Sequence, residues 1–171
     1  MTARNMIRER FIECYKNASP EIKSRMDKYG IKAHIDRNRI TFLDLKYMQY
    51  LFPEKNFREL LVTATAMCGH SKSIAGQEFF NVDNYPNAEP ALGIRKSASL
   101  PHVFKRPRYL GRYYMDGGVT QNLPLQYFVE RYQDYPGDIL ALQFTRPQKK
   151  LKDTPDTKKT DGRFSHWYRG C

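Results

Sequence analysis

Short apolar strands alternate with helices along this 171-residue chain, and the alternation limits which folds it can adopt. Runs rich in β-branched, apolar or aromatic residues predict strands at 60–66, 77–82, 112–115 and 139–144. Residues with helical spacing predict helices at 41–52, at 88–99 and after Asn122, which we expect to be the N-cap of the last one. Such alternation is typical of an α/β layered architecture, in which helices cover a sheet.

Local signals mark where several of these elements begin and end. Thr41 and Asp44 have the spacing of a capping box, and Pro53 should stop the helix that they open. Ser19 followed by Pro20 predicts another helix start. The strands at 60–66 and 77–82 are expected to form a hairpin, because the residues between them are polar and turn-like.

The net charge of +11 lies mainly at the two ends of the chain. Residues 1–40 hold ten Lys and Arg against five Asp and Glu, residues 41–147 hold twelve against ten, and residues 148–171 hold seven against three. We therefore expect a basic helical segment over 1–37, a folded domain over 38–147 and a basic, disordered tail over 148–171. A nucleic-acid-binding domain more often carries its charge on the folded core, so we expect no nucleic-acid partner.

Cysteine and histidine spacing indicates neither a disulfide framework nor a metal site. The three cysteines are scattered and form no CxxC pair, which suggests a reducing compartment. The four histidines form no HExxH or HxH pair, so we predict no metal and no cofactor. No signal peptide and no stretch long enough to span a bilayer is recognisable, so we expect a cytoplasmic or peripheral membrane location.

Asp116 comes directly after the aromatic strand and is followed by Gly117 and Gly118. Glycine tolerates positive φ and lets another backbone or a ligand approach closely, so the turn can present an unobstructed carboxylate. Asp-Gly is also the commonest turn dipeptide, and a plain turn is the alternative interpretation. Ligands of α/β sheets collect at the carboxyl ends of strands, which favours a functional Asp116.

Five segments of the chain, taken in order, resemble a known family. They are Ile40-Thr41-Phe42, Leu61 to Thr65, Ile94 to Phe104, Tyr114 to Val119, and Asn122-Leu123-Pro124. Together they are similar to the C-terminal half of a patatin-like phospholipase domain, over about residues 38–146. The resemblance implies a partial three-layer α/β/α fold with a mostly parallel or mixed central sheet. It also implies a lipid acyl hydrolase with a Ser–Asp dyad, in which Asp116 is the general base and Gly117 and Gly118 support its turn.

The nucleophile half of that pattern is not found in this sequence. The family's serine lies in a GxSxG motif upstream of the matched segments, and no GxSxG occurs here. The nearest sequence, around His70 and Ser71, has serine in place of the last glycine and is expected to be a hairpin turn. Ser97 and Ser99 are expected to be packing and capping groups. We therefore expect a fragment that carries the dyad aspartate and is inactive alone, unless another polypeptide supplies the serine.

Two other interpretations stay open at this point. The chain could be a non-catalytic basic module that binds anionic membrane surfaces, with Lys105, Arg106, Arg108 and Arg112 as candidate headgroup contacts. As half of a sheet with an exposed edge, it could also fail to fold stably on its own. For the hydrolase fragment and for the membrane-binding module, the expected partner is a phospholipid or another acyl lipid at a membrane surface.

Overall fold

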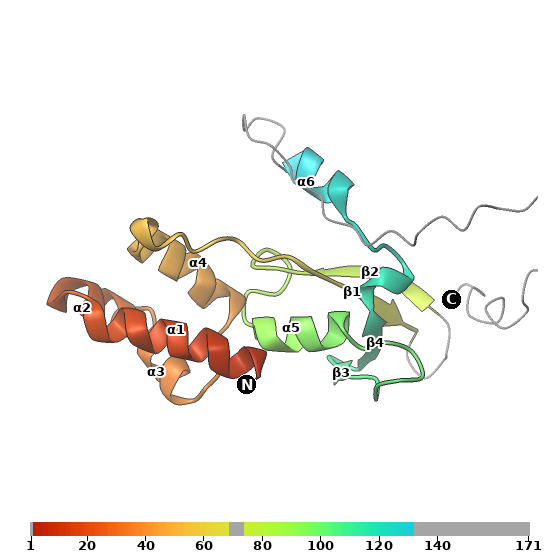
Figure 1. Ribbon diagram of the computed structural model, residues 1–171, viewed down its shortest axis with the longest axis horizontal. Coiled ribbons are helices and arrows are strands. Elements are labelled where there is room, and N and C mark those ends of the chain that lie inside the picture. The colour runs from red at the N-terminus through yellow and green to blue at the C-terminus, as the bar shows by residue number, and fades with distance from the viewer. Residues whose placement is uncertain (1, 69–73, 132–171) are drawn as a thin grey trace, which may run out of the picture.

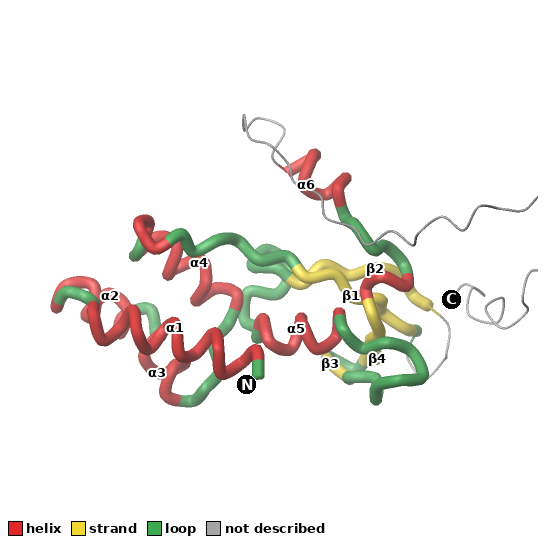
Figure 2. Tube along the Cα trace, viewed as in Figure 1, coloured by secondary structure: helices red, strands yellow, loops and turns green. Residues whose placement is uncertain are grey.

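The computed structural model describes residues 2–68 and 74–131 (Figure 1). Its α-helices are α1 (Ala3–Asn17), α2 (Pro20–Lys28), α3 (Ile31–Asp36), α4 (Phe42–Leu51), α5 (Pro90–Ser97) and α6 (Leu125–Arg131), with short 3-10 helices η1 (Pro53–Lys55) and η2 (Gly117–Val119). Its strands are β1 (Val62–Met67), β2 (Ile74–Phe80), β3 (Arg108–Tyr109) and β4 (Arg112–Asp116). Helices α1 to α4 gather at one end, and the strands lie at the other (Figure 2).

The helix starts follow the local signals in the sequence. Ser19 accepts a hydrogen bond from the backbone N–H of Ile22, with Pro20 as the first helical residue of α2. Thr41 and Asp44 form the predicted capping box at the start of α4, and Phe52 ends that helix just before Pro53. These predictions are confirmed, because a cap depends only on residues three or four positions apart.

Helices α1 to α4 enclose the first of two hydrophobic cores. The buried residues of this core are Phe11, Cys14, Ala18, Met26, Ile31, Ile35, Ile40, Met48, Leu51 and Phe52. The core includes residues from both sides of the boundary expected between residues 37 and 38. The first helices therefore pack with α4 through shared apolar side chains, and Arg4 of α1 also forms an ion pair with Glu89, beside α5.

The second core lies between the sheet and α5. Its buried residues are Phe42, Val62, Ala64, Ala66, Phe80, Ala88 and Tyr114. Because successive side chains of a strand point to opposite faces, the alternating residues Val62, Ala64 and Ala66 of β1 all lie on the face that α5 covers. Gly93 of α5 sits against this face: a Cβ there would lie 3.4 Å from Phe80 and 3.6 Å from Val62.

The four described strands pair in the order β2-β1-β4-β3, and every pair is antiparallel. The predicted hairpin of β1 and β2 is confirmed, with Val62 opposite Phe80. A second hairpin joins β3 to β4 through Leu110 and Gly111, which both have positive φ, at 45° and 81°. Two positive φ values are the mark of a tight two-residue hairpin turn. Strand β3, which has only two residues, was not predicted.

The prediction of a mostly parallel or mixed central sheet is wrong. Both direct strand connections in the described chain are hairpins, which force neighbouring strands to run antiparallel. Helix α5 does not serve as a crossover between adjacent parallel strands, because it connects β2 to β3 at opposite edges of the sheet. The alternation of strands and helices therefore predicted the α/β composition but not the strand directions.

The remaining predictions concern the residues after β4 and those that the structure does not describe. Helix α6 begins at Leu125, so Asn122 lies too far upstream to be its N-cap, and that prediction is wrong. The predicted strand at 139–144, the tail at 148–171 and the turn with His70 and Ser71 lie outside the described residues. Within residues 2–68 and 74–131, none of the helices has the length and apolar character needed to cross a bilayer.

Candidate functional site

Asp116 is the last residue of β4 and is held from three directions. Its backbone N–H donates to the carbonyl oxygen of Ser99, at 2.9 Å, just beyond the end of α5. Its own carbonyl oxygen accepts a hydrogen bond from Thr65 Oγ1, at 2.8 Å, in β1. Its carboxylate Oδ1 accepts from the N–H of Gly118, at 2.7 Å. The carboxylate therefore sits on a backbone that β1, α5 and the following turn all fix.

The register of the sheet places Asp116 on the face that α5 covers. Asp116 is opposite Ala64 in β1, and Ala64 is opposite Glu78 in β2. Directly opposed residues point to the same face of a sheet, so this row shares its face with the second core. Asp116 is half-buried at the end of this row, where the described sheet stops.

The two glycines after Asp116 are explained by crowding. Neither has a positive φ, so the conformational freedom of glycine is not what the turn requires. A Cβ on Gly117 would lie 2.5 Å from the carbonyl oxygen of Thr63 and closer still to its Oγ1. A Cβ on Gly118 would lie 3.0 Å from Oδ1 of Asp116 and from Oδ1 of Asn122. Of the two reasons expected for these glycines, close approach of another backbone is the one that holds.

Replacing Gly117 with alanine should therefore destabilise the protein by about 2 kcal/mol or more, since overpacking of this kind typically costs about 1–3 kcal/mol. The contact is with the backbone of β1, which cannot move without disturbing the sheet. Gly118→Ala is the matched control, because the atoms that it meets are the ends of side chains, and it should cost less. Urea unfolding of the two variants measures the difference. Equal stabilities would contradict the role assigned to the contact with Thr63.

No hydroxyl group in the described chain donates to the Asp116 carboxylate. Thr65 Oγ1 bonds the Asp116 carbonyl and lies 2.9 Å from Thr120 Oγ1. Ser99 is buried, and its hydroxyl donates to the carbonyl oxygen of Arg95, at 2.6 Å, as expected of a capping group. Ser97 is half-buried in the last turn of α5. Within residues 2–68 and 74–131, carboxylate Oδ2 has no hydrogen-bond partner, so it can accept a further donor.

The four predicted headgroup cations lie on the loop after α5 and on the β3–β4 hairpin. Arg112 lies at the opposite end of β4, and its guanidinium forms an ion pair with Glu78, at 2.7 Å. Arg108 packs over the ring of Tyr113, 5.7 Å from its centroid. Lys105 is exposed and Arg106 is half-buried in the loop between α5 and β3. The basic residues therefore flank the site along a loop and a hairpin.

Sequence reasoning missed a buried cluster around Lys96. This side chain is fully buried, and its Nζ lies 3.7 Å from the ring centroids of Phe80 and Tyr109 and 4.6 Å from that of Tyr114. It has no hydrogen-bond partner among the described residues. Burial lowers the pKa of Lys96 to about 7, and the nearby Glu78 carboxylate opposes the shift. Only the helical position of Lys96, three residues after the core residue Gly93, could have signalled its burial.

Glu78 is the acceptor at the centre of this cluster. Its Oε2 accepts hydrogen bonds from the hydroxyls of Tyr85, at 2.8 Å, and Tyr114, at 2.9 Å, while Oε1 pairs with Arg112. Burial and the bond to Glu78 raise the pKa of Tyr85 to about 12 and raise the pKa of Tyr114 as well. The cluster fastens β2 to β4, and Glu78 lies in the same cross-strand row as Ala64 and Asp116.

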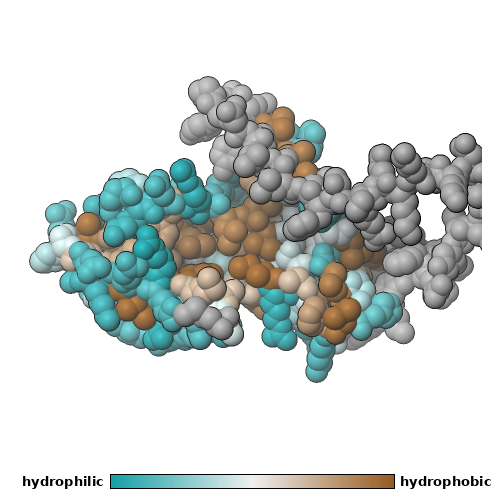
Figure 3. All heavy atoms as spheres, viewed as in Figure 1, coloured by the Kyte–Doolittle hydropathy of each residue, from teal (hydrophilic) through white to brown (hydrophobic). Residues whose placement is uncertain are grey.

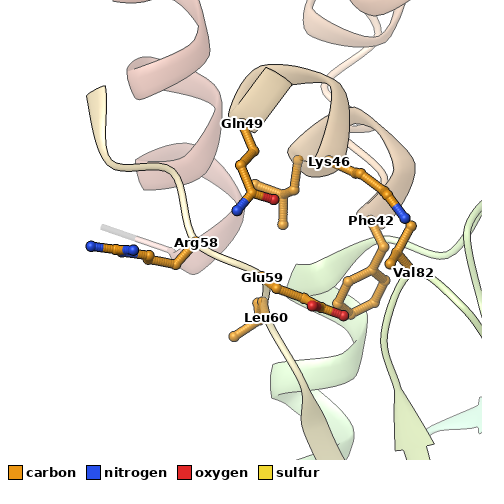
Figure 4. A pocket seen from close by; sticks show the side chains of 8 residues that line it. Phe42, Lys46, Gln49, Arg58, Glu59, Leu60 and Val82 are labelled. Carbon is orange, nitrogen blue, oxygen red and sulfur yellow. The ribbon is translucent and has the colours of Figure 1, made fainter. Parts of the chain in front are cut away.

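A small pocket between α4 and the start of β1 is separate from the Asp116 site. It is lined by Phe42, Leu45, Lys46, Gln49, Arg58, Glu59, Leu60 and Val82. Figure 4 shows the Arg58 side chain pointing away from Glu59. Its volume of about 30 Å³ admits little more than a water molecule. We assign this pocket no substrate.

The structure is an α/β arrangement in which α5 covers a four-stranded sheet, and the anchored Asp116 lies at the end of strand β4. The family model that matches the chain is Patatin-like phospholipase, over residues 7–129. The chain therefore belongs to the patatin-like phospholipase family, and the resemblance drawn from the five segments is confirmed. The match begins upstream of residue 38 and includes the N-terminal helices. A search of curated proteins found none that matches the chain.

Proposed function

We propose that this chain carries the general base of a lipid acyl hydrolase, with Asp116 as the aspartate of a Ser–Asp dyad. Family membership over residues 7–129 supports a phospholipid acyl ester as the substrate. The observation that carries the proposal is the triple anchoring of Asp116 by Ser99, Thr65 and Gly118. The sequence contains no GxSxG motif, so the nucleophilic serine comes from another polypeptide segment, and the chain is inactive alone.

The chemistry assigned to Asp116 is proton transfer. Oδ1 is occupied by the Gly118 N–H, and Oδ2 accepts the proton of a serine hydroxyl placed within roughly 3 Å. The serine oxygen then attacks the ester carbonyl carbon. The tetrahedral intermediate expels the alcohol of the lipid, which takes the proton from Asp116. Water, deprotonated by the same carboxylate, releases the fatty acid and restores the serine. Oxyanion donors come from the segment that supplies the serine.

Reconstitution tests this proposal. The chain is mixed or co-expressed with a GxSxG-containing segment of a patatin-like protein, and release of fatty acid from phosphatidylcholine is measured. We expect no release from either part alone and release from the pair. The matched control is the pair with the GxSxG serine replaced by alanine. A pair that forms a stable complex and still releases no fatty acid would refute the proposed function.

A second candidate is non-catalytic binding to anionic membrane surfaces. One structural observation favours it: Val103 and Phe104 are 67% and 56% exposed, directly beside Lys105 in the sequence. Binding of vesicles by the chain without any hydrolysis after reconstitution would select this function over the first.

A further inference from the structure

Exposed apolar side chains are concentrated in α5 and in the segment that follows it. Across the described residues, nine large hydrophobic side chains are exposed, and five of them lie between residues 94 and 110. These five are Ile94, Leu100, Val103, Phe104 and Leu110, with exposed fractions from 36% to 74%. Single exposed hydrophobic residues need no explanation, but a concentration within one short segment marks an interaction surface.

The charges in and around this segment, over residues 90–115, are all positive. Residues 90–115 contain six Lys and Arg and no Asp or Glu. Of these six, Lys96 is buried and Arg112 pairs with Glu78. Among the ion pairs of the described chain, none involves Arg95, Lys105 or Arg108. The segment therefore presents cations that its own structure does not neutralise.

A pocket brings two of these cations together with the apolar residues. It lies at the C-terminal end of α5 and is lined by Arg95, Ala98, Ser99, Phe104 and Lys105, with a volume of about 400 Å³. The walls thus offer two cations, one aromatic ring and a small apolar residue. This combination suits a phosphate group whose attached chain lies along an apolar surface.

The mixture points to a lipid surface as the occupant. Figure 3 shows hydrophobic and hydrophilic residues side by side over the loop that follows α5. Segments that lie in a membrane interface combine apolar side chains with Lys and Arg, and anionic lipids attract such cations. The core of a protein interface is instead depleted in lysine and in charge generally. Charge complementarity therefore favours an anionic bilayer over a protein partner.

The segment is also joined to the candidate catalytic residue. Ser99, in the wall of the pocket, holds the backbone N–H of Asp116 at 2.9 Å. We propose that residues 94–110 form a lipid-docking surface, with Val103 and Phe104 entering the acyl boundary and Arg95 and Lys105 binding a lipid phosphate. This inference rests on the lipid substrate of the proposed function, and it names the membrane surface from which that substrate is taken.

Vesicle partitioning of the full chain tests the docking surface. Vesicles of phosphatidylcholine are compared with vesicles that also contain about one-third phosphatidylserine, at low and physiological salt. Wild type should partition more strongly onto the anionic vesicles. Two double variants, Val103→Ser with Phe104→Ser and Arg95→Ser with Lys105→Ser, should each lower that partitioning by at least about tenfold. The variant without Val103 and Phe104 should partition less at both salt concentrations. The variant without Arg95 and Lys105 should partition less mainly at low salt.

Matched controls separate the docking surface from the general positive charge. Lys28→Ser with Lys46→Ser removes two exposed cations elsewhere, and Met6→Ser with Tyr50→Ser removes two exposed apolar side chains. Both control variants should change partitioning by less than about threefold. Equal losses in controls and docking variants, or no binding by wild type, would overturn the inference.

A reporter variant gives a second readout that does not depend on removing residues. The tryptophan fluorescence of the Phe104→Trp variant, made in a Trp167→Phe background, should be quenched by lipids brominated on their acyl chains. A tryptophan at the exposed residue Tyr50 in the same background should not be quenched. Absence of quenching at residue 104 on vesicles that bind the chain would contradict insertion. The measurement needs no hydrolysis, so its failure is distinct from failure of the proposed Ser–Asp dyad.

Discussion

Asp116→Asn should lower kcat/KM for phospholipid hydrolysis by the reconstituted pair by about 10²- to 10⁴-fold, the usual contribution of a general base. Asparagine has nearly the same shape and can still accept the hydrogen bond from the Gly118 N–H. Its amide cannot take up the proton of a serine hydroxyl at neutral pH. The loss should therefore appear in kcat, with little change in KM, because the group that is removed acts only as the proton moves.

The control for this variant is Asp36→Asn, which removes an exposed carboxylate paired with Lys32 on the surface of α3. Surface pairs of this kind contribute little to stability, and this one lies outside the proposed site. Thermal melts of both variants should match wild type, which separates a chemical defect from a folding defect. Activity that persists in a correctly folded Asp116→Asn pair would remove Asp116 from the mechanism.

Lys96→Met should stabilise the protein by about 2 kcal/mol or more near pH 6. Each unit by which burial lowers the pKa means that the folded state with a charged Lys96 is destabilised by about 1.4 kcal/mol. The pKa of Lys96 is lowered from 10.5 to about 7. The faces of the three surrounding rings attract the ammonium and offset part of that cost. Methionine fills a similar volume without a charge, and replacement of a buried charge by an apolar residue is often stabilising.

The pH dependence of unfolding provides a signature that packing alone would not produce. Between about pH 7 and pH 10 the unfolded state keeps the Lys96 proton while the folded state releases it, so wild-type stability should rise with pH. Above about pH 10 the raised pKa values of Tyr85 and Tyr114 should make stability fall again. Glu78 is the other charged group that acts on Lys96, and it pairs with Arg112.

Urea unfolding from pH 6 to about pH 11 measures both the rise and the fall in stability. Lys96→Met should lack the rise between pH 7 and pH 10, and its advantage over wild type should shrink as the pH increases. Lys28→Met, at an exposed position of α2, is the matched control and should follow the wild-type profile. A Lys96→Met variant that is less stable than wild type at pH 6 would show that the ring contacts outweigh the cost of burial.

Short-range features of this protein were determined by the sequence alone. The capping box of Thr41 and Asp44, the Ser19–Pro20 helix start and the hairpin of β1 and β2 all matched their predictions. Each depends on residues that are near neighbours in the chain. The family resemblance also came from the sequence, because its five segments occur in order with their expected spacings. Asp116 was singled out in the same way, as the residue after an aromatic strand, and its catalytic role stays a prediction.

Only the tertiary structure decided the features that join distant residues. Strand direction depends on how β4 meets β1, some 50 residues away, and periodicity within a strand carries no information on that pairing. The contact of Gly117 with Thr63 and the anchor from Ser99 to Asp116 arise from the same register. Lys96 was missed because a lysine in a helix is normally solvated, and its burial requires rings from the three strands β2, β3 and β4 to close around it. The sequence thus determined which aspartate is presented, and packing between distant segments decided how it is held.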